Sequence, residues 1–280
     1  LSEPLNFRFV QVEAPWPLGP ADGRYIVRGH AGEPSHVLVI ATLGAERRKR
    51  FRRRTRAASP KPEPTAVAVG RATLIDARPL EGSPADWLRE ADCEAEALAG
   101  LAVVNSVLQR QRIVAADPAA HGIAPTQALV LRVGVGVGEE VASGRWSSAT
   151  EVILGAGRRR RETVLSPQER LAAVLSGRDV ILACEELTLR ARADVDAGRW
   201  REAALQLDCA LRAAIAELAS WAGQGDLDER IALLAQAAKP AADAAQTALI
   251  GGLSADQIEA LGKTLQTLEA ALRARVAIAR

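Results

Sequence analysis

Two patterns of hydrophobic and polar positions divide the chain, and the change falls near residue 160. Before it, apolar and polar residues alternate in short stretches separated by turns that contain Gly or Pro, which is typical of β-strands. After it, apolar residues recur every three or four positions in an Ala- and Leu-rich sequence, which is typical of amphipathic helices. We therefore expect an α+β domain at residues 1–157 followed by an all-α domain at residues 166–280.

The N-terminal pattern predicts an antiparallel sheet with one long helix. Strand-like stretches lie at residues 7–13, 24–28, 36–42, 65–76, 128–133 and 147–154. The helix is expected to start at Ser83, an effective N-cap, since Pro84 follows at a position where helices tolerate proline. Apolar residues then continue at helical spacing to about Arg112, so we expect this helix to bury one face against the sheet.

The C-terminal pattern predicts a helical hairpin or bundle. Helices are expected at about residues 168–175, 179–196, 200–221, 227–250 and 255–279. Capping boxes at Ser166–Glu169 and Ser254–Gln257 support two of the starts, and Pro240 is expected to break or kink the fourth helix.

The last predicted helix carries a short leucine seam with a heptad-like repeat. Its apolar residues follow one another at spacings of three, four, three and four: Ile258, Leu261, Leu265, Leu268 and Leu272. This pattern covers about two heptads, whereas self-standing coiled coils usually need three or four. Two interpretations stay open: the seam packs inside its own bundle, or it forms the interface of a homodimer.

Residues 197–211 resemble the turn and second helix of a tetratricopeptide repeat. Five residues fit that motif: Gly198, Trp200, Ala203, Leu207 and Ala210. The positions expected upstream and the closing proline are absent, and no second copy occurs about 34 residues away. We therefore expect a helical hairpin of similar geometry and not an array of repeats.

Charge is unevenly distributed, although 36 Lys and Arg nearly balance 34 Asp and Glu. Residues 1–165 hold 23 basic and 18 acidic residues, and eight of those basic residues fall within residues 47–56, here called the basic segment. They are Arg47, Arg48, Lys49, Arg50, Arg52, Arg53, Arg54 and Arg56. Such density is incompatible with a core strand, so we expect a protruding loop at residues 46–64 that either contacts a polyanion, such as nucleic acid, or is only solvated.

The residues that usually carry catalysis form no recognisable arrangement. The run Val133–Gly138 lacks the third glycine and the helix of a dinucleotide-binding fingerprint, so we interpret it as a strand whose glycines allow close backbone approach. The three histidines lie in separate segments without metal-ligand spacing. Cys93, Cys184 and Cys209 are expected to pack inside helices, and their number and spacing favour a reducing, cytoplasmic setting over a disulfide framework.

These observations favour a non-enzymatic protein-protein interaction or adaptor protein without a metal or cofactor. Its partner would contact a helical groove around Trp200 and Leu207, and the terminal helix at Leu261, Leu265 and Leu268. One alternative is a nucleic-acid-associated protein that binds the phosphate backbone through the basic segment. A lesser alternative is an enzyme with its site at the domain junction, near residues 155–166. No apolar stretch reaches the length of a transmembrane span.

Overall fold

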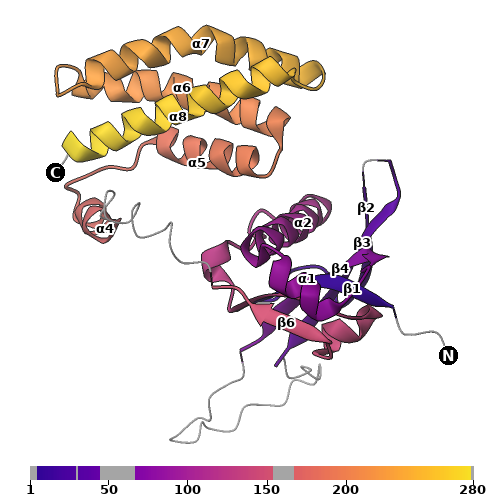
Figure 1. Ribbon diagram of the computed structural model, residues 1–280. Coiled ribbons are helices and arrows are strands. Elements are labelled where there is room, and N and C mark those ends of the chain that lie inside the picture. Colours follow the sequence, from indigo (N-terminus) through magenta and orange to yellow (C-terminus); the bar gives the residue numbers. More distant parts are fainter. Residues whose placement is uncertain (1–4, 30, 45–66, 154–166, 279–280) are drawn as a thin grey trace, which may run out of the picture. The chain divides into compact units, whose positions relative to one another are not determined.

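The chain forms two compact units, Leu1–Leu154 and Gly155–Arg280. The structure is a computed structural model that describes residues 5–29, 31–44, 67–153 and 167–278 (Figure 1). The described part of the first unit combines strands and helices, and that of the second is helical, which confirms the predicted α+β and helical arrangement. The predicted loop at residues 46–64 and the predicted junction at residues 155–166 lie outside the described residues.

The first unit is built on a six-stranded antiparallel sheet in the order β2-β3-β4-β1-β5-β6. All six predicted strands are present, with ends shifted by a few residues. Their bounds are β1 Asn6–Ala14, β2 Gly23–Arg28, β3 Pro34–Leu43, β4 Val69–Pro79, β5 Val130–Val137 and β6 Ser148–Glu151. Strand β1 is hydrogen-bonded to β4 and β5 on its two edges, and its residues 9–12 are all buried.

Two helices, α1 (Pro84–Glu90) and α2 (Cys93–Val114), pack on one face of this sheet (Figure 1). The prediction of one continuous helix is wrong at Ala91, whose backbone is extended with ψ of 140°. The next residue, Asp92, caps a new helix by accepting a hydrogen bond from the Ala95 N–H at 3.0 Å. In α2, Gly100 allows close packing, since a Cβ there would lie 2.6 Å from the Cβ of Val10.

The other face of the sheet is partly covered by a short 3₁₀ segment, η2 (Gly138–Ser143), and by Trp146. The glycines of β5 make this approach close. A Cβ on Gly134 would lie 2.6 Å from the carbonyl oxygen of Ser148, and one on Gly136 would lie 2.5 Å from Val141. This confirms the interpretation of the glycine-rich run as a strand that needs close backbone approach. A second 3₁₀ turn, η1 (Pro125–Gln127), precedes β5.

The second unit is a bundle in which four helices share one core of Ala and Leu side chains (Figure 1). Its elements are α4 Pro167–Leu175, α5 Ala183–Asp196, α6 Trp200–Leu218, η3 Ala219–Trp221, α7 Leu227–Ile250 and α8 Ala255–Ile278. Helices α5 and α6 form the predicted hairpin, and Gly198 in its turn has φ of +67°, a conformation that favours glycine. Pro240 does not break α7, which continues to Ile250.

No helix in the part of the chain that the structure describes combines the length and the apolar character needed to cross a bilayer.

Candidate functional site

A groove of about 280 Å³ opens between α6, α7 and α8 in the second unit. Its walls are formed largely by small side chains, including Ala204 on α6, Ala241 and Ala244 on α7, and Ala260 on α8. Because alanine fills little space, the three helices leave a depression where larger residues would close the surface. Pro240 lies in the same wall, and its missing N–H removes one hydrogen bond from the interior of α7.

The rim of this α6–α8 groove carries acidic groups. Asp243 on α7 and Asp256 in the first turn of α8 both line it. The Asp243 carboxylate contacts the Lys239 ammonium at 2.8 Å, but both side chains are largely exposed, so this pair contributes little to stability. Within the described residues, Asp256 takes part in no ion pair. The groove is therefore apolar inside, and its edge carries the Asp256 carboxylate beside the Asp243–Lys239 pair.

The structure places the predicted partner-binding residues in different environments. Leu207 and Leu261 line the α6–α8 groove while being 2% and 4% exposed. Leu265 and Leu268 are fully buried in the core of the bundle. Trp200 is half-buried at the start of α6 and does not line the groove.

These positions bear on two of our expectations. Leu265 and Leu268 belong to the core because α8 packs on α5, α6 and α7, so the leucine seam leaves no exposed stripe for a second copy of the chain. A groove does exist beside Leu207, but it forms against α7 and α8 and not around Trp200. Sequence periodicity identifies which residues face inward, yet it does not identify which neighbouring helix covers them.

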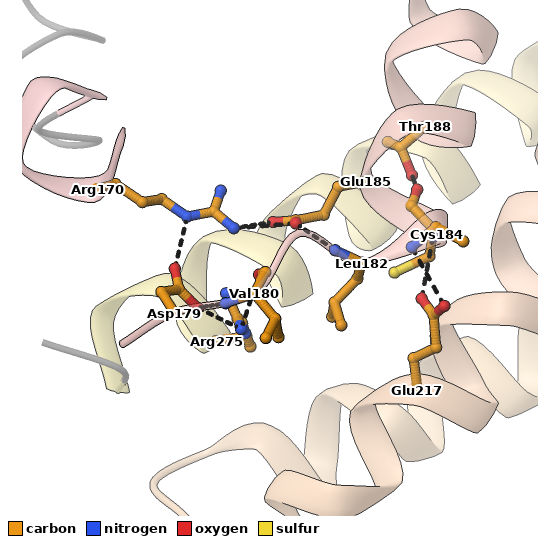
Figure 2. Close-up of polar contacts among 10 residues, drawn as sticks. Arg170, Asp179, Val180, Leu182, Cys184, Glu185, Thr188, Glu217 and Arg275 are labelled. Carbon is orange, nitrogen blue, oxygen red and sulfur yellow. Dashed lines mark hydrogen bonds and ion pairs between the residues drawn. The ribbon is translucent and has the colours of Figure 1, made fainter. Parts of the chain in front are cut away.

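A second feature of the same unit is a network of four charged side chains that joins α4, α5 and α8 (Figure 2). The Asp179 carboxylate accepts hydrogen bonds from Arg275 Nη2 at 2.6 Å and from Arg170 Nε at 3.0 Å. Arg170 also donates to both oxygens of Glu185, at 2.7 and 2.9 Å. Although burial disfavours the charged carboxylate, the donors around it, including the Val180 N–H, hold the pKa of Asp179 below its usual value.

Arg275 is the most deeply buried charged residue of this network, at 1% exposure. Its guanidinium stacks over the ring of Trp221, with 4.7 Å between its Cζ and the ring centroid. Its Nε and Nη1 atoms have no hydrogen-bond partner among the described residues. Asp179 is therefore the charge that makes the burial of Arg275 tolerable.

The start of α5 depends on a carboxylate from the neighbouring helix (Figure 2). Glu217 on α6 accepts hydrogen bonds from the backbone N–H groups of Ala183, at 3.2 Å, and Cys184, at 3.0 Å. Leu182 occupies the N-cap position and has no side-chain acceptor, so Glu217 satisfies N–H groups that a local cap would otherwise bind.

The thiol beside this carboxylate is not set up for nucleophilic chemistry. Burial and the adjacent Glu217 raise the pKa of Cys184 far above its ordinary value, so the thiol stays protonated. Cys184 is buried, as predicted, and Cys93 is partly buried, but Cys209 is exposed on α6, so the packing prediction is wrong for Cys209. Among the described residues, no group of three or more His, Cys, Asp or Glu side chains is placed to hold a metal ion.

The sequence pattern did not single out Arg275, Asp179 or Glu217. The only available signal was an arginine at a position of α8 that continues the inward-facing leucine spacing, three residues after Leu272. The basic segment, with Arg47 to Arg56, lies outside the described residues, so its binding role stays a prediction. Comparison of the chain with family models, curated proteins and solved structures gave no match.

Proposed function

We propose that the chain is a non-enzymatic interaction or adaptor protein whose helical unit binds a helical segment of another protein in the α6–α8 groove. The observation that supports this proposal is an open apolar groove bordered by Leu207 and Leu261 and lined with alanine. Helix-in-groove recognition uses such a surface, because an apolar anchor on the partner can replace water there.

The charge of the rim specifies the chemistry of the partner. Asp243 and Asp256 favour a segment in which Lys or Arg flanks the apolar anchor, and they disfavour an acidic segment. The volume of about 280 Å³ lies just below the roughly 300–1,000 Å³ typical of pockets for drug-sized ligands. It therefore suits one or two anchoring side chains and not a large cofactor.

The proposal is tested by titrating the full chain, labelled with ¹⁵N, with a model peptide. The probe is a helical peptide of Ala, Lys and Leu whose leucines lie on one face, and the control is the same peptide with Glu in place of Lys. We expect the basic peptide to shift amide signals of Ala244, Ala260 and Leu261, and the acidic peptide to leave them unchanged. Equal shifts with both peptides, or shifts confined to other parts of the chain, would contradict the proposal.

The nucleic-acid alternative makes a separate prediction about the basic segment. If all eight basic side chains neutralised phosphates, the logarithm of the affinity for duplex DNA would fall with the logarithm of salt concentration at a slope of about −7. Replacing the eight residues by Ser would then abolish that slope without changing the response to the helical peptide. The two measurements therefore distinguish the two functions.

A further inference from the structure

The first unit contains a second pocket, of about 230 Å³, between helices α1 and α2 and the sheet. We call it the strand-end pocket, because its polar residues lie near the start of β1, the start of β3 and the end of β4. Its apolar floor includes Val10, Leu74 and Val133. The close approach of α2 at Gly100 forms one wall.

Strand pairing brings three polar side chains of the pocket together. His36 on β3 lies directly opposite Asp76 on β4, and Asp76 forms an ion pair with Arg8 on β1. The register between β1 and β4 shifts at this point, so that Phe7 pairs with Pro79 but Phe9 pairs with Ile75. Such irregularities re-aim side chains and are frequent next to functional sites. The spacing of Arg8, His36 and Asp76 along the sequence does not indicate that they lie together.

The charges in this cluster are largely balanced internally. Asp76 accepts a hydrogen bond from the Arg78 N–H at 2.9 Å as well as the contact with Arg8, so both of its oxygens are engaged. Burial is the largest influence on His36 and lowers its pKa, which favours the neutral imidazole. Arg8, Asp76 and His36 together therefore carry no net charge near neutral pH.

Glu96 adds a negative charge to a pocket whose other charged side chains balance one another. It extends from the first turn of α2, is partly buried, and lines the strand-end pocket together with Trp87 of α1. Within the described residues, the Glu96 carboxylate has no hydrogen bond or ion pair. A glutamate in a first helical turn is favoured by the helix dipole, but that explanation applies equally to Glu94, which is exposed and does not line the pocket.

We propose that the strand-end pocket binds a small organic ammonium ion, with Glu96 as its counter-ion and Trp87 as its aromatic contact. A carboxylate and the face of an indole are complementary to a cation, and the apolar floor can take the hydrocarbon part of such a ligand. The volume of about 230 Å³ restricts the class to small amines, since it is below that of most drug-sized sites.

The test uses three compounds of similar shape and different charge, each titrated into the ¹⁵N-labelled full chain at low salt. They are 2-phenylethylammonium, neutral 2-phenylethanol and the anion 3-phenylpropionate. We expect saturable shifts of Glu96, Ala99 and Gly100 signals with the ammonium compound, and affinity about tenfold weaker for the alcohol, since its neutral O–H can donate a hydrogen bond to Glu96 but cannot form an ion pair with it. The anion is expected not to bind.

Matched variants assign the effect to the pocket. Glu96→Gln is expected to weaken ammonium binding about tenfold, whereas Glu94→Gln on the exposed side of the same turn is expected to leave it unchanged. Trp87→Leu, with folding checked by the dispersion of the spectrum, is expected to weaken binding as well. Tighter binding of 3-phenylpropionate, absence of saturable binding by any compound, or equal affinity in Glu96→Gln would overturn the proposal.

Discussion

Glu217 on α6 caps the first turn of α5 through the backbone N–H of Cys184, at 3.0 Å (Figure 2). The cap therefore comes from a residue 33 positions away along the chain and links the two helices of the hairpin. It makes the start of α5 depend on correct packing of α6, which is a tertiary contact and not a local sequence signal.

We predict that Glu217→Ala lowers the free energy of unfolding of the helical unit by about 1–2 kcal/mol, the usual cost of losing an N-cap acceptor. Urea unfolding followed by circular dichroism at pH 7 measures this change. Glu202→Ala is the matched control, because Glu202 is an exposed residue of the same helix, and its effect should stay within about 0.5 kcal/mol. Equal losses in the two variants would contradict the assigned cap.

The same carboxylate predicts a dependence of stability on pH. Burial disfavours the charged form of Glu217, but hydrogen bonds from Cys184 and Ala183 outweigh it and hold the pKa below its ordinary value of 4.5. A depressed pKa means that the stabilisation is complete above the unfolded-state pKa and is lost as pH falls through the folded-state pKa. The difference in unfolding free energy between wild type and Glu217→Gln should therefore be largest above about pH 5 and shrink towards pH 3. A constant difference over this range would show that the charge of Glu217 is not responsible.

Asp179 is predicted to be essential for the burial of Arg275. Asp179→Asn leaves the guanidinium without a carboxylate in a site where it is 1% exposed, which should cost about 3 kcal/mol or more. The double variant Asp179→Asn, Arg275→Met removes the uncompensated charge and should recover part of that loss. Thermal or urea unfolding of both variants measures the effect.

An exposed ion pair on α8 provides the control for this prediction. Glu259 and Lys263 form a pair whose side chains are about 70% exposed, so Glu259→Gln should change stability by less than about 0.5 kcal/mol. If Asp179→Asn were as mild as Glu259→Gln, or if the double variant were no more stable than the single one, the account of Arg275 would be wrong.

Replacing Gly134 with a larger residue is predicted to destabilise the sheet. Gly134→Ala would place a Cβ within 2.8 Å of Ser148, Ala149 and Phe9, two of which are contacts with the neighbouring strand β6. Overpacking of this kind typically costs about 1–3 kcal/mol. Gly252→Ala, where no atom lies within 4 Å of the added Cβ, should change the unfolding free energy far less. Similar stability of the two variants would contradict the close approach described for β5.

The sequence pattern predicted the elements well where each depends on neighbouring residues. The six strands and the helices from Pro167 to Ile278 follow from alternation, helical spacing and capping residues, which are local properties. The break at Ala91 was missed because the apolar spacing continues across it, while Asp92 offers a competing N-cap.

The candidate sites were much less accessible to sequence analysis. Leu207 and Leu261 were singled out from different patterns, but their meeting in one groove depends on how α6, α7 and α8 pack. Arg8, His36 and Asp76 are brought together only by strand register, including a shift between β1 and β4. Such contacts are made between residues tens of positions apart, so neither periodicity nor motif spacing predicts them.

The central claim concerns the α6–α8 groove, and a pair of alanine substitutions tests it most directly. Ala260 is exposed and lines the groove, so Ala260→Phe fills it without disturbing the core, whereas Ala277→Phe adds the same side chain at an exposed position of α8 that does not line it. Isothermal titration of the full chain with the basic helical peptide gives the affinity of each variant.

We predict that Ala260→Phe weakens binding of this peptide at least about tenfold, a loss of roughly 1.4 kcal/mol, and that Ala277→Phe binds like wild type. Unchanged affinity in Ala260→Phe, with both variants folded, would contradict the proposal that the helical unit binds its partner in this groove.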